Sequence, residues 1–189
     1  MDNNTTAWLT VPAPAKLNLM LHITGRREDG YHELQTIFQF LDYGDQLSFQ
    51  IRTDDTLTLT PEISGLNFED NLIIKAARSL QSHANARGKN CGANIRLEKT
   101  LPMGGGLGGG SSDAATTMLA LNVLWQLELS LEELAKIGVK LGADVPVFIK
   151  GQACWAEGIG EKIIPLPDLA ENWFLVACPN VHSDTKEIF

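Results

Sequence analysis

The feature that most constrains this chain is a glycine-rich segment that runs directly into a predicted helix. The segment reads Pro102-Met103-Gly104-Gly105-Gly106-Leu107-Gly108-Gly109-Gly110-Ser111-Ser112-Asp113 and holds six of the 17 glycines in a chain of 189 residues. Glycine has no Cβ, so such a loop can turn its backbone N–H groups toward one anion. The helix that follows adds unpaired N–H donors and the positive end of its dipole. The segment therefore predicts a phosphate-binding loop, with Ser111 and Ser112 placed to contact phosphate or a phosphate-bound magnesium ion.

Other interpretations of this segment compete with that one. The glycine spacing suits a Walker A loop, but Ser111 stands where that motif requires lysine. The glycines also fit the dinucleotide fingerprint G-x-G-x-x-G, and Glu128 follows at about the twenty-residue distance that the fingerprint expects. The preceding strand, however, alternates with charged residues and is separated from the glycines by Pro102, which does not suit a strand buried on both faces. A flexible linker would not adjoin an amphipathic helix.

Composition narrows the possible ligands and locations. The net charge of −8 leaves no basic stripe for a nucleic-acid backbone, so a phosphate ligand must be attracted by local donors. The chain shows neither an apolar run long enough to span a membrane nor a basic or apolar leader, so we expect a cytoplasmic protein without membrane or nucleic-acid partners. Cys91, Cys154 and Cys178 are widely spaced, and we expect reduced thiols packed in the fold.

Hydrophobic periodicity predicts early strands and later helices. We expect strands at residues 17–23, 34–41 and 93–97, a hairpin formed by 47–51 and 57–59, and further strands around Cys154 and at 174–177. We expect a first helix capped by Asp70 or Asn71, a second after the glycine loop, and a third that opens with the capping box Ser130–Glu133 and ends near Gly142. This order predicts an α+β fold with a largely antiparallel sheet.

Four motifs, taken together, resemble one enzyme family. They are the loop PMGGGLGGGSSDAA at residues 102–115, PAKLNL at 14–19, DGYH at 29–32 and GADVPVF at 142–148. The chain resembles the GHMP kinases, which include galactokinase, homoserine kinase, mevalonate kinase and phosphomevalonate kinase. Within that family it is similar to the kinases of the non-mevalonate (MEP) isoprenoid pathway whose acceptor carries a cytidine diphosphate group. The resemblance implies a ribosomal-protein-like two-layer fold with the helices on one face of the sheet.

The resemblance also implies an activity and its cofactors. Members of this branch transfer the γ-phosphoryl group of ATP to the 2-hydroxyl of the methylerythritol moiety, with Mg²⁺. By resemblance Asp144 is the catalytic base and Lys16 the second catalytic residue. The role we assign to Asp144 is to orient the hydroxyl and accept its proton late, since a loose phosphoryl-transfer transition state asks mainly for positioning and charge neutralisation. Lys16 orients Asp144 and stabilises charge on the transferring group. Taken alone, Asp144 before Val-Pro also suits a helix cap.

The remaining site residues are matched one by one to the family's motifs. For ATP they are Asn71, Lys99 and the loop residues Pro102, Met103, Gly104, Gly105, Gly106, Leu107, Gly108, Gly109, Gly110, Ser111 and Ser112, with Ser112 also the candidate Mg²⁺ contact. For the acceptor substrate they are Asn18, Tyr31, His32, Asp144 and Phe189. By themselves Asn71 and Lys99 have the pattern of a helix cap and a surface charge. Tyr31, His32 and Phe189 would hold a cytosine ring, which homoserine and mevalonate lack.

The resemblance divides the chain unevenly. We expect residues 1–165 to form the ATP-binding domain and residues 166–189 to lead into a C-terminal domain that this sequence lacks. The fragment is then expected to turn over its substrate poorly, which leaves a nucleotide-binding module without catalysis as an alternative function. Another GHMP kinase of the homoserine or mevalonate type is the second alternative. The sequence makes no prediction of oligomeric state.

Overall fold

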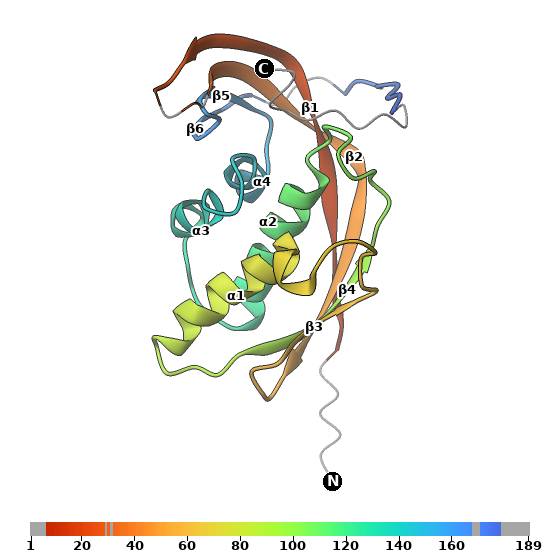
Figure 1. Cartoon of the computed structure of the whole chain (residues 1–189), viewed down its shortest axis with the longest axis vertical. Coiled ribbons are helices and arrows are strands. Elements are labelled where there is room, and N and C mark those ends of the chain that lie inside the picture. Colours follow the sequence, from red (N-terminus) through yellow and green to blue (C-terminus); the bar gives the residue numbers. More distant parts are fainter. Residues whose placement is uncertain (1–6, 29, 31, 168–170, 179–189) are drawn as a thin grey trace.

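The computed structural model describes residues 7–28, 30, 32–167 and 171–178. In this part of the chain a six-stranded sheet carries its helices on one face, as predicted (Figure 1). The strands and helices are, in chain order, β1 (Leu9–Arg26), β2 (His32–Arg52), β3 (Leu57–Thr60), η1 (Phe68–Asp70), α1 (Leu72–Asn85), β4 (Gly92–Glu98), α2 (Gly109–Leu124), α3 (Leu131–Gly138), α4 (Val145–Lys150), β5 (Cys154–Gly158) and β6 (Lys162–Pro165). The predicted α+β class with a largely antiparallel sheet is confirmed.

The long strand β2 organises the sheet. The stretches 34–41 and 47–51, expected as separate strands, are parts of this one strand. One edge of β2 pairs with β1 along almost its whole length, from Leu9 opposite Phe49 to Arg26 opposite His32. The other edge is shared, since β5 pairs with residues 34–38 and β4 with residues 46–52. Residues 39–45 of β2 lie between these two partners, and the β2 residues that line the candidate site, Leu34, Thr36 and Phe38, come just before this stretch.

The predicted hairpin between residues 47–51 and 57–59 is wrong. Strand β4 lies between the two stretches, so that Ala93 is the partner of Ile51 on one side and of Leu57 on the other. Asp54 turns the chain away from β2, because its carboxylate accepts the Thr56 amide at 3.1 Å and pairs with Arg52. Strand β3 then runs parallel to β4, joined through α1, which is the crossover that a parallel pair requires. Alternation identified both strands but not their partner.

The helices form at the positions that their caps and apolar faces predict. Asn71 caps α1 by accepting the Ile73 amide at 2.9 Å, and Ser130 and Glu133 form the predicted capping box of α3. The third helix ends at Gly138, four residues earlier than expected. The core lies between the helices and the sheet, where each large apolar side chain contributes roughly 1.5–3 kcal/mol by burial. Its fully buried members include Leu47, Phe49, Ile74, Leu80, Ile95, Met118 and Leu121.

Two expectations about the later part of the chain are corrected. Residues 174–177 form no strand, since residues 171–178 have neither helical nor strand structure, and Trp173 and Leu175 are almost fully exposed. Cys91 and Cys154 are buried free thiols as expected, but Cys178 is exposed. No described helix combines the length and the apolar character needed to cross a bilayer.

Candidate functional site

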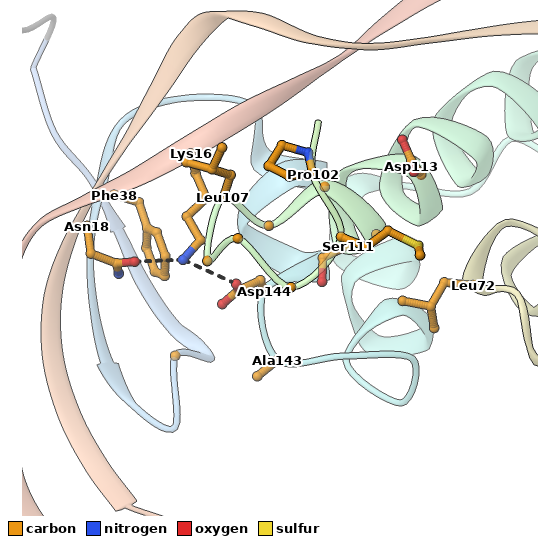
Figure 2. A pocket seen from close by; sticks show the side chains of 18 of the residues that line it. Lys16, Asn18, Phe38, Leu72, Pro102, Leu107, Ser111, Asp113, Ala143 and Asp144 are labelled. Carbon is orange, nitrogen blue, oxygen red and sulfur yellow. Dashed lines mark hydrogen bonds and ion pairs between the residues drawn. The ribbon is translucent and has the colours of Figure 1, made fainter. Parts of the chain in front are cut away.

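A cavity of about 760 Å³ lies between the glycine-rich segment and the paired parts of β1 and β2 at residues 16–21 and 34–38. One side is formed by the loop at 102–110, by Lys99 and by the start of α1 at residues 71–73. The other side is formed by Lys16 and Asn18 of β1, by residues of β2, and by Asp144 (Figure 2). The structure thus brings the predicted nucleotide residues and the predicted catalytic residues to one cavity.

The loop has the backbone shape that an anion cradle needs. Gly104, Gly106 and Gly108 have φ of 74°, 71° and 73°, so every second residue is in the left-handed region. Gly108 is also the N-cap of α2, and no described side chain caps that helix end. A Cβ on Gly108 would lie 2.8 Å from the Phe148 ring and 3.0 Å from Lys16 Cγ. The close approach keeps the helix start against Phe148 and Lys16, and its first N–H groups can bind an anion.

Lys16, Asn18 and Asp144 form one cluster opposite this loop. Lys16 Nζ donates to Asn18 Oδ1 at 2.6 Å and lies 3.6 Å from Asp144 Oδ2 (Figure 2). Lys16 and Asn18 point the same way because they are two residues apart on a strand. Irregularities in the β1–β2 register flank them on both sides, which is how strands re-aim side chains at sites.

Polar contacts with β2 and with the glycine loop hold the cluster in place. Asn18 Nδ2 donates to Thr36 Oγ1 at 2.7 Å, and that hydroxyl donates to the Met20 carbonyl at 2.7 Å. The Lys16 amide donates to the Leu107 carbonyl at 3.0 Å, which ties β1 to the glycine loop. The Lys16 ammonium also lies 5.4 Å from the centroid of the Phe38 ring. Lys16 is therefore a nearly buried, positioned cation, unlike the solvated lysine usual on a strand.

Asp144 does not act as a helix cap. It occupies the N-cap position of α4, but its backbone is helical, with φ −81° and ψ −17°, and its side chain makes no capping hydrogen bond. Its carboxylate instead turns toward Lys16, and one third of the side chain remains exposed in the cavity. The carboxylate is thus available to accept a proton from a bound hydroxyl group.

Lys99 is held by two carboxylates beneath the loop. Its ammonium contacts Asp45 Oδ2 at 2.5 Å and Asp113 Oδ2 at 2.8 Å, so the surface-charge interpretation does not apply. Burial raises the pKa of Asp113 to about 7, against the opposing effect of Lys99 and together with the charge of Asp45. Burial opposes the charge of Lys99 too, but the two carboxylates outweigh it and the pKa of Lys99 is raised.

The other predicted nucleotide residues differ in what they present to the cavity. Asn71 lines the cavity, although its side-chain oxygen is used in capping α1. Ser111 lines the cavity, whereas Ser112 is fully buried and its hydroxyl has no hydrogen-bond partner among the described residues. A buried hydroxyl without a partner beside the loop suits a ligand that arrives with a nucleotide. Its oxygen could coordinate Mg²⁺, which prefers oxygen ligands.

Of the residues predicted to hold the cytosine ring, only His32 lies among the described residues. His32 is the first residue of β2, opposite Arg26, and does not line the cavity. Tyr31 and Phe189 lie outside the described residues. Their roles remain predictions.

Sequence reasoning missed several side chains of the cavity. Thr36, Phe38 and Ile159 gave no signal, since each sits in an ordinary strand or turn pattern and reaches the cavity through sheet register. Asp113 lies inside the quoted loop motif, and Asp45 interrupts an apolar strand, so both could have been singled out as charges that need partners.

Comparison with known proteins shows what the chain is similar to. The family model described as "GHMP kinases N terminal domain" matches residues 71–152, which include the loop and Asp144. The chain is 60% identical over 189 residues to the 4-diphosphocytidyl-2-C-methyl-D-erythritol kinase of Shewanella loihica, covering 100% of this chain and 64% of the relative. It is 59% identical over 181 residues to the enzyme of that name from Pseudomonas aeruginosa LESB58, covering 96% of this chain and 63% of the relative.

Solved structures agree with the fold. A crystal structure of 4-(cytidine 5'-diphospho)-2C-methyl-D-erythritol kinase matches with a TM-score of 0.69 at 41% identity, covering 84% of this chain and 55% of that one. Homoserine kinase from Cytophaga hutchinsonii matches with a TM-score of 0.64 at 17% identity, covering 99% of this chain and 60% of that one, and shows the fold alone. The chain spans 63% to 64% of the length of the two curated relatives.

Proposed function

We propose that the chain belongs to the GHMP kinase family and is the nucleotide-binding part of a kinase that phosphorylates the 2-hydroxyl of 4-diphosphocytidyl-2-C-methyl-D-erythritol with ATP, in the non-mevalonate isoprenoid pathway. The observation that carries the proposal is the Lys16–Asp144 pair, which faces the glycine loop across one cavity. The name shared by relatives at about 60% identity supports the choice of substrate. The use of ATP as phosphoryl donor supports our proposal of a cytoplasmic location.

In this proposal the glycine loop binds the phosphates, and Lys16 and Asp144 act on the acceptor hydroxyl and the transferring group. Backbone N–H groups of residues 104–110 and the start of α2 bind the phosphates, with Asn71 and Lys99 at the nucleotide side. Asp144 orients the acceptor hydroxyl and accepts its proton, while Lys16 holds Asp144 and offsets negative charge on the transferring group. Mg²⁺ supplies further charge neutralisation when bound with the nucleotide, with the Ser112 hydroxyl as its candidate protein ligand.

We also propose the substrate contacts and the domain division. Asn18 lines the acceptor side of the cavity, and Tyr31, His32 and Phe189 hold the cytosine ring by stacking and polar contacts. Residues 1–165 form the ATP-binding domain, and residues 166–189 lead toward a C-terminal domain. The end of β6 at Pro165 and the lack of regular structure in residues 171–178 support this division.

Nucleotide binding by this chain is the first test. Mg-ATP at a concentration well above its Kd should raise the melting temperature, because a ligand that binds only the folded state stabilises it, by about 2.7 kcal/mol at 100 Kd. NADH is the control ligand for the dinucleotide interpretation. A shift with NADH and none with millimolar Mg-ATP would contradict the proposal.

Substrate choice is the second test. Phosphoryl transfer from ATP to 4-diphosphocytidyl-2-C-methyl-D-erythritol should exceed transfer to homoserine or mevalonate, measured in the longest active form of the protein beside the Shewanella loihica relative. Preference for homoserine or mevalonate would reassign the enzyme within the family. Nucleotide binding without transfer to any of the three would favour a binding module.

A further inference from the structure

Asp45 is a buried carboxylate that accepts three hydrogen bonds from one short segment, residues 99–101. Its Oδ1 accepts the amides of Thr100 at 2.6 Å and Leu101 at 2.8 Å, and its Oδ2 accepts from Lys99 Nζ. The β2–β4 ladder ends with Gln46 opposite Glu98, so the Asp45 side chain takes over where backbone pairing stops. Residues 99–101 join β4 to the glycine loop, and a buried charge that is compensated in this way fixes their position.

Lys99 connects this anchor to the other end of the loop. Its second partner, Asp113, belongs to α2, so one ammonium ties the segment before the loop to the helix after it. The start of α2 packs on the same contact, since a Cβ on Gly109 would lie 3.2 Å from Lys99 Nζ and 3.4 Å from Asp45 Oδ2. A lysine ammonium has three donors, and two are occupied here. The side chain remains one-quarter exposed where it lines the cavity, so the third donor is available to a ligand.

We propose that Asp45 is a positioning residue for nucleotide binding, which acts through Lys99 to hold both ends of the phosphate loop and to aim one Lys99 donor into the cavity. This inference rests on the proposed function. Asp45 itself does not line the cavity, so its effect on a nucleotide must pass through Lys99 and the backbone of residues 100–101. Two carboxylates on one ammonium also restrict Lys99 to a single direction, whereas one partner would leave its long side chain free to turn.

A double-mutant cycle in the 189-residue chain tests this coupling, with the Kd of the ATP analogue AMP-PNP and Mg²⁺ measured by calorimetry. Asp45→Asn keeps one oxygen as the acceptor for the two amides and turns an NH2 group, which cannot accept a hydrogen bond, toward Lys99. We expect it to weaken nucleotide binding by about tenfold in the natural sequence and by less than twofold when Lys99→Met is already present. A merely structural role for Asp45 would weaken binding equally in both backgrounds.

The outcomes separate this inference from the proposed function. If Asp45→Asn changes the nucleotide Kd equally with and without Lys99, or changes it in neither background, the inference is overturned. Nucleotide binding by the natural sequence would still support the proposed function. No binding by the natural sequence would overturn both. If Asp45→Asn fails to fold, as judged by circular dichroism, Asp113→Asn takes its place in the cycle, because it removes the other carboxylate from the same ammonium. The same non-additivity is then expected, and additivity would overturn the inference.

Discussion

The two sides of the cavity differ in how far apart their residues lie in the sequence. The side with the glycine loop comes mostly from one stretch, Lys99 to Asp113, to which the start of α1 is added, and it depends on the conformations of neighbouring glycines. The opposite side collects Lys16, Thr36 and Asp144 from two strands and a helix start. The first side is a local motif, so it can be recognised in a sequence and damaged by one backbone change. The second is a product of sheet register, so each of its members depends on contacts that distant segments provide.

The largest expected effect is on the assembled side. Asp144→Asn should lower kcat by about 10²–10⁴-fold, since it removes the charge and the proton acceptor but keeps the shape of the side chain. Nucleotide affinity should stay within about twofold, because the loop is built separately. Steady-state kinetics in the longest active form and calorimetry with Mg-ATP measure the two quantities. Asp55→Asn, at an exposed position, is the control. A variant that keeps a third of normal kcat would show that Asp144 is not the base.

The next effect breaks the local motif. Gly108→Ala should lower the free energy of unfolding by about 2–4 kcal/mol and abolish the thermal shift with Mg-ATP, because the added Cβ meets the Phe148 ring and φ is positive. Gly88→Ala is the matched control, since Gly88 has the same φ of +73° with nothing within 4 Å of a Cβ. It should cost only about 1 kcal/mol. Equal losses in denaturant titrations would mean that the close approach at Gly108 is unimportant.

A third prediction concerns pH and the charges beneath the loop. Since the pKa of Asp113 is raised to about 7 from 3.8, the folded state holds a proton that the unfolded state releases, and stability falls as pH rises from about 4 through 7. Asp113→Asn removes this dependence. Its stability relative to the natural sequence should therefore rise by about 2 kcal/mol between pH 5 and pH 8. Urea unfolding at both pH values measures the difference, with the exposed Asp42→Asn as control. A difference that does not change with pH would contradict the raised pKa.

The smallest expected effect sharpens the contrast between the two sides. Thr36→Val should lower kcat by about fivefold, because Asn18 loses the buried hydroxyl that orients it, the equivalent of about 1 kcal/mol. Nucleotide affinity should not change. Thr58→Val is the matched control, since that hydroxyl also contacts an asparagine of the sheet but lies away from the cavity. If both variants reduce kcat equally, the effect comes from the sheet in general and not from the orientation of Asn18.

The sequence predicted the structure correctly where that structure depends on residues close together in the chain. The glycine loop, the cap at Asn71 and the capping box at Ser130 all depend on residues within four positions, and each was predicted from chemistry that acts over that range. The α+β class followed because strand and helix periodicities differ. The catalytic roles of Lys16 and Asp144 were predicted through family resemblance and remain predictions, because a lone lysine on a strand and a lone aspartate before a helix have commoner structural explanations.

What the sequence could not supply was partnership between distant segments. Alternation at residues 47–51 and 57–59 is the same whether the two stretches pair with each other or with a third strand, and the third strand came later in the chain. The apolar run at 174–177 has strand composition, yet residues 171–178 have no strand partner among the described residues. Asp45 shows the same limit. The sequence shows a charged residue within an apolar stretch, but it does not show that Lys99, more than fifty residues away, is its partner.

The placement of β4 between β2 and β3 also has a consequence for folding during synthesis. During synthesis β1 and β2 can pair as soon as both have left the ribosome, but β3 has no neighbour until residues 92–98 appear. Until then the edge of β2 at residues 46–52 is open to pairing with other chains. The strand that closes this edge is the one that carries the phosphate loop at its end. A nascent chain thus closes this edge and positions the glycine-rich segment in the same docking event. Under the proposed function, nucleotide binding would then favour chains that have completed this step.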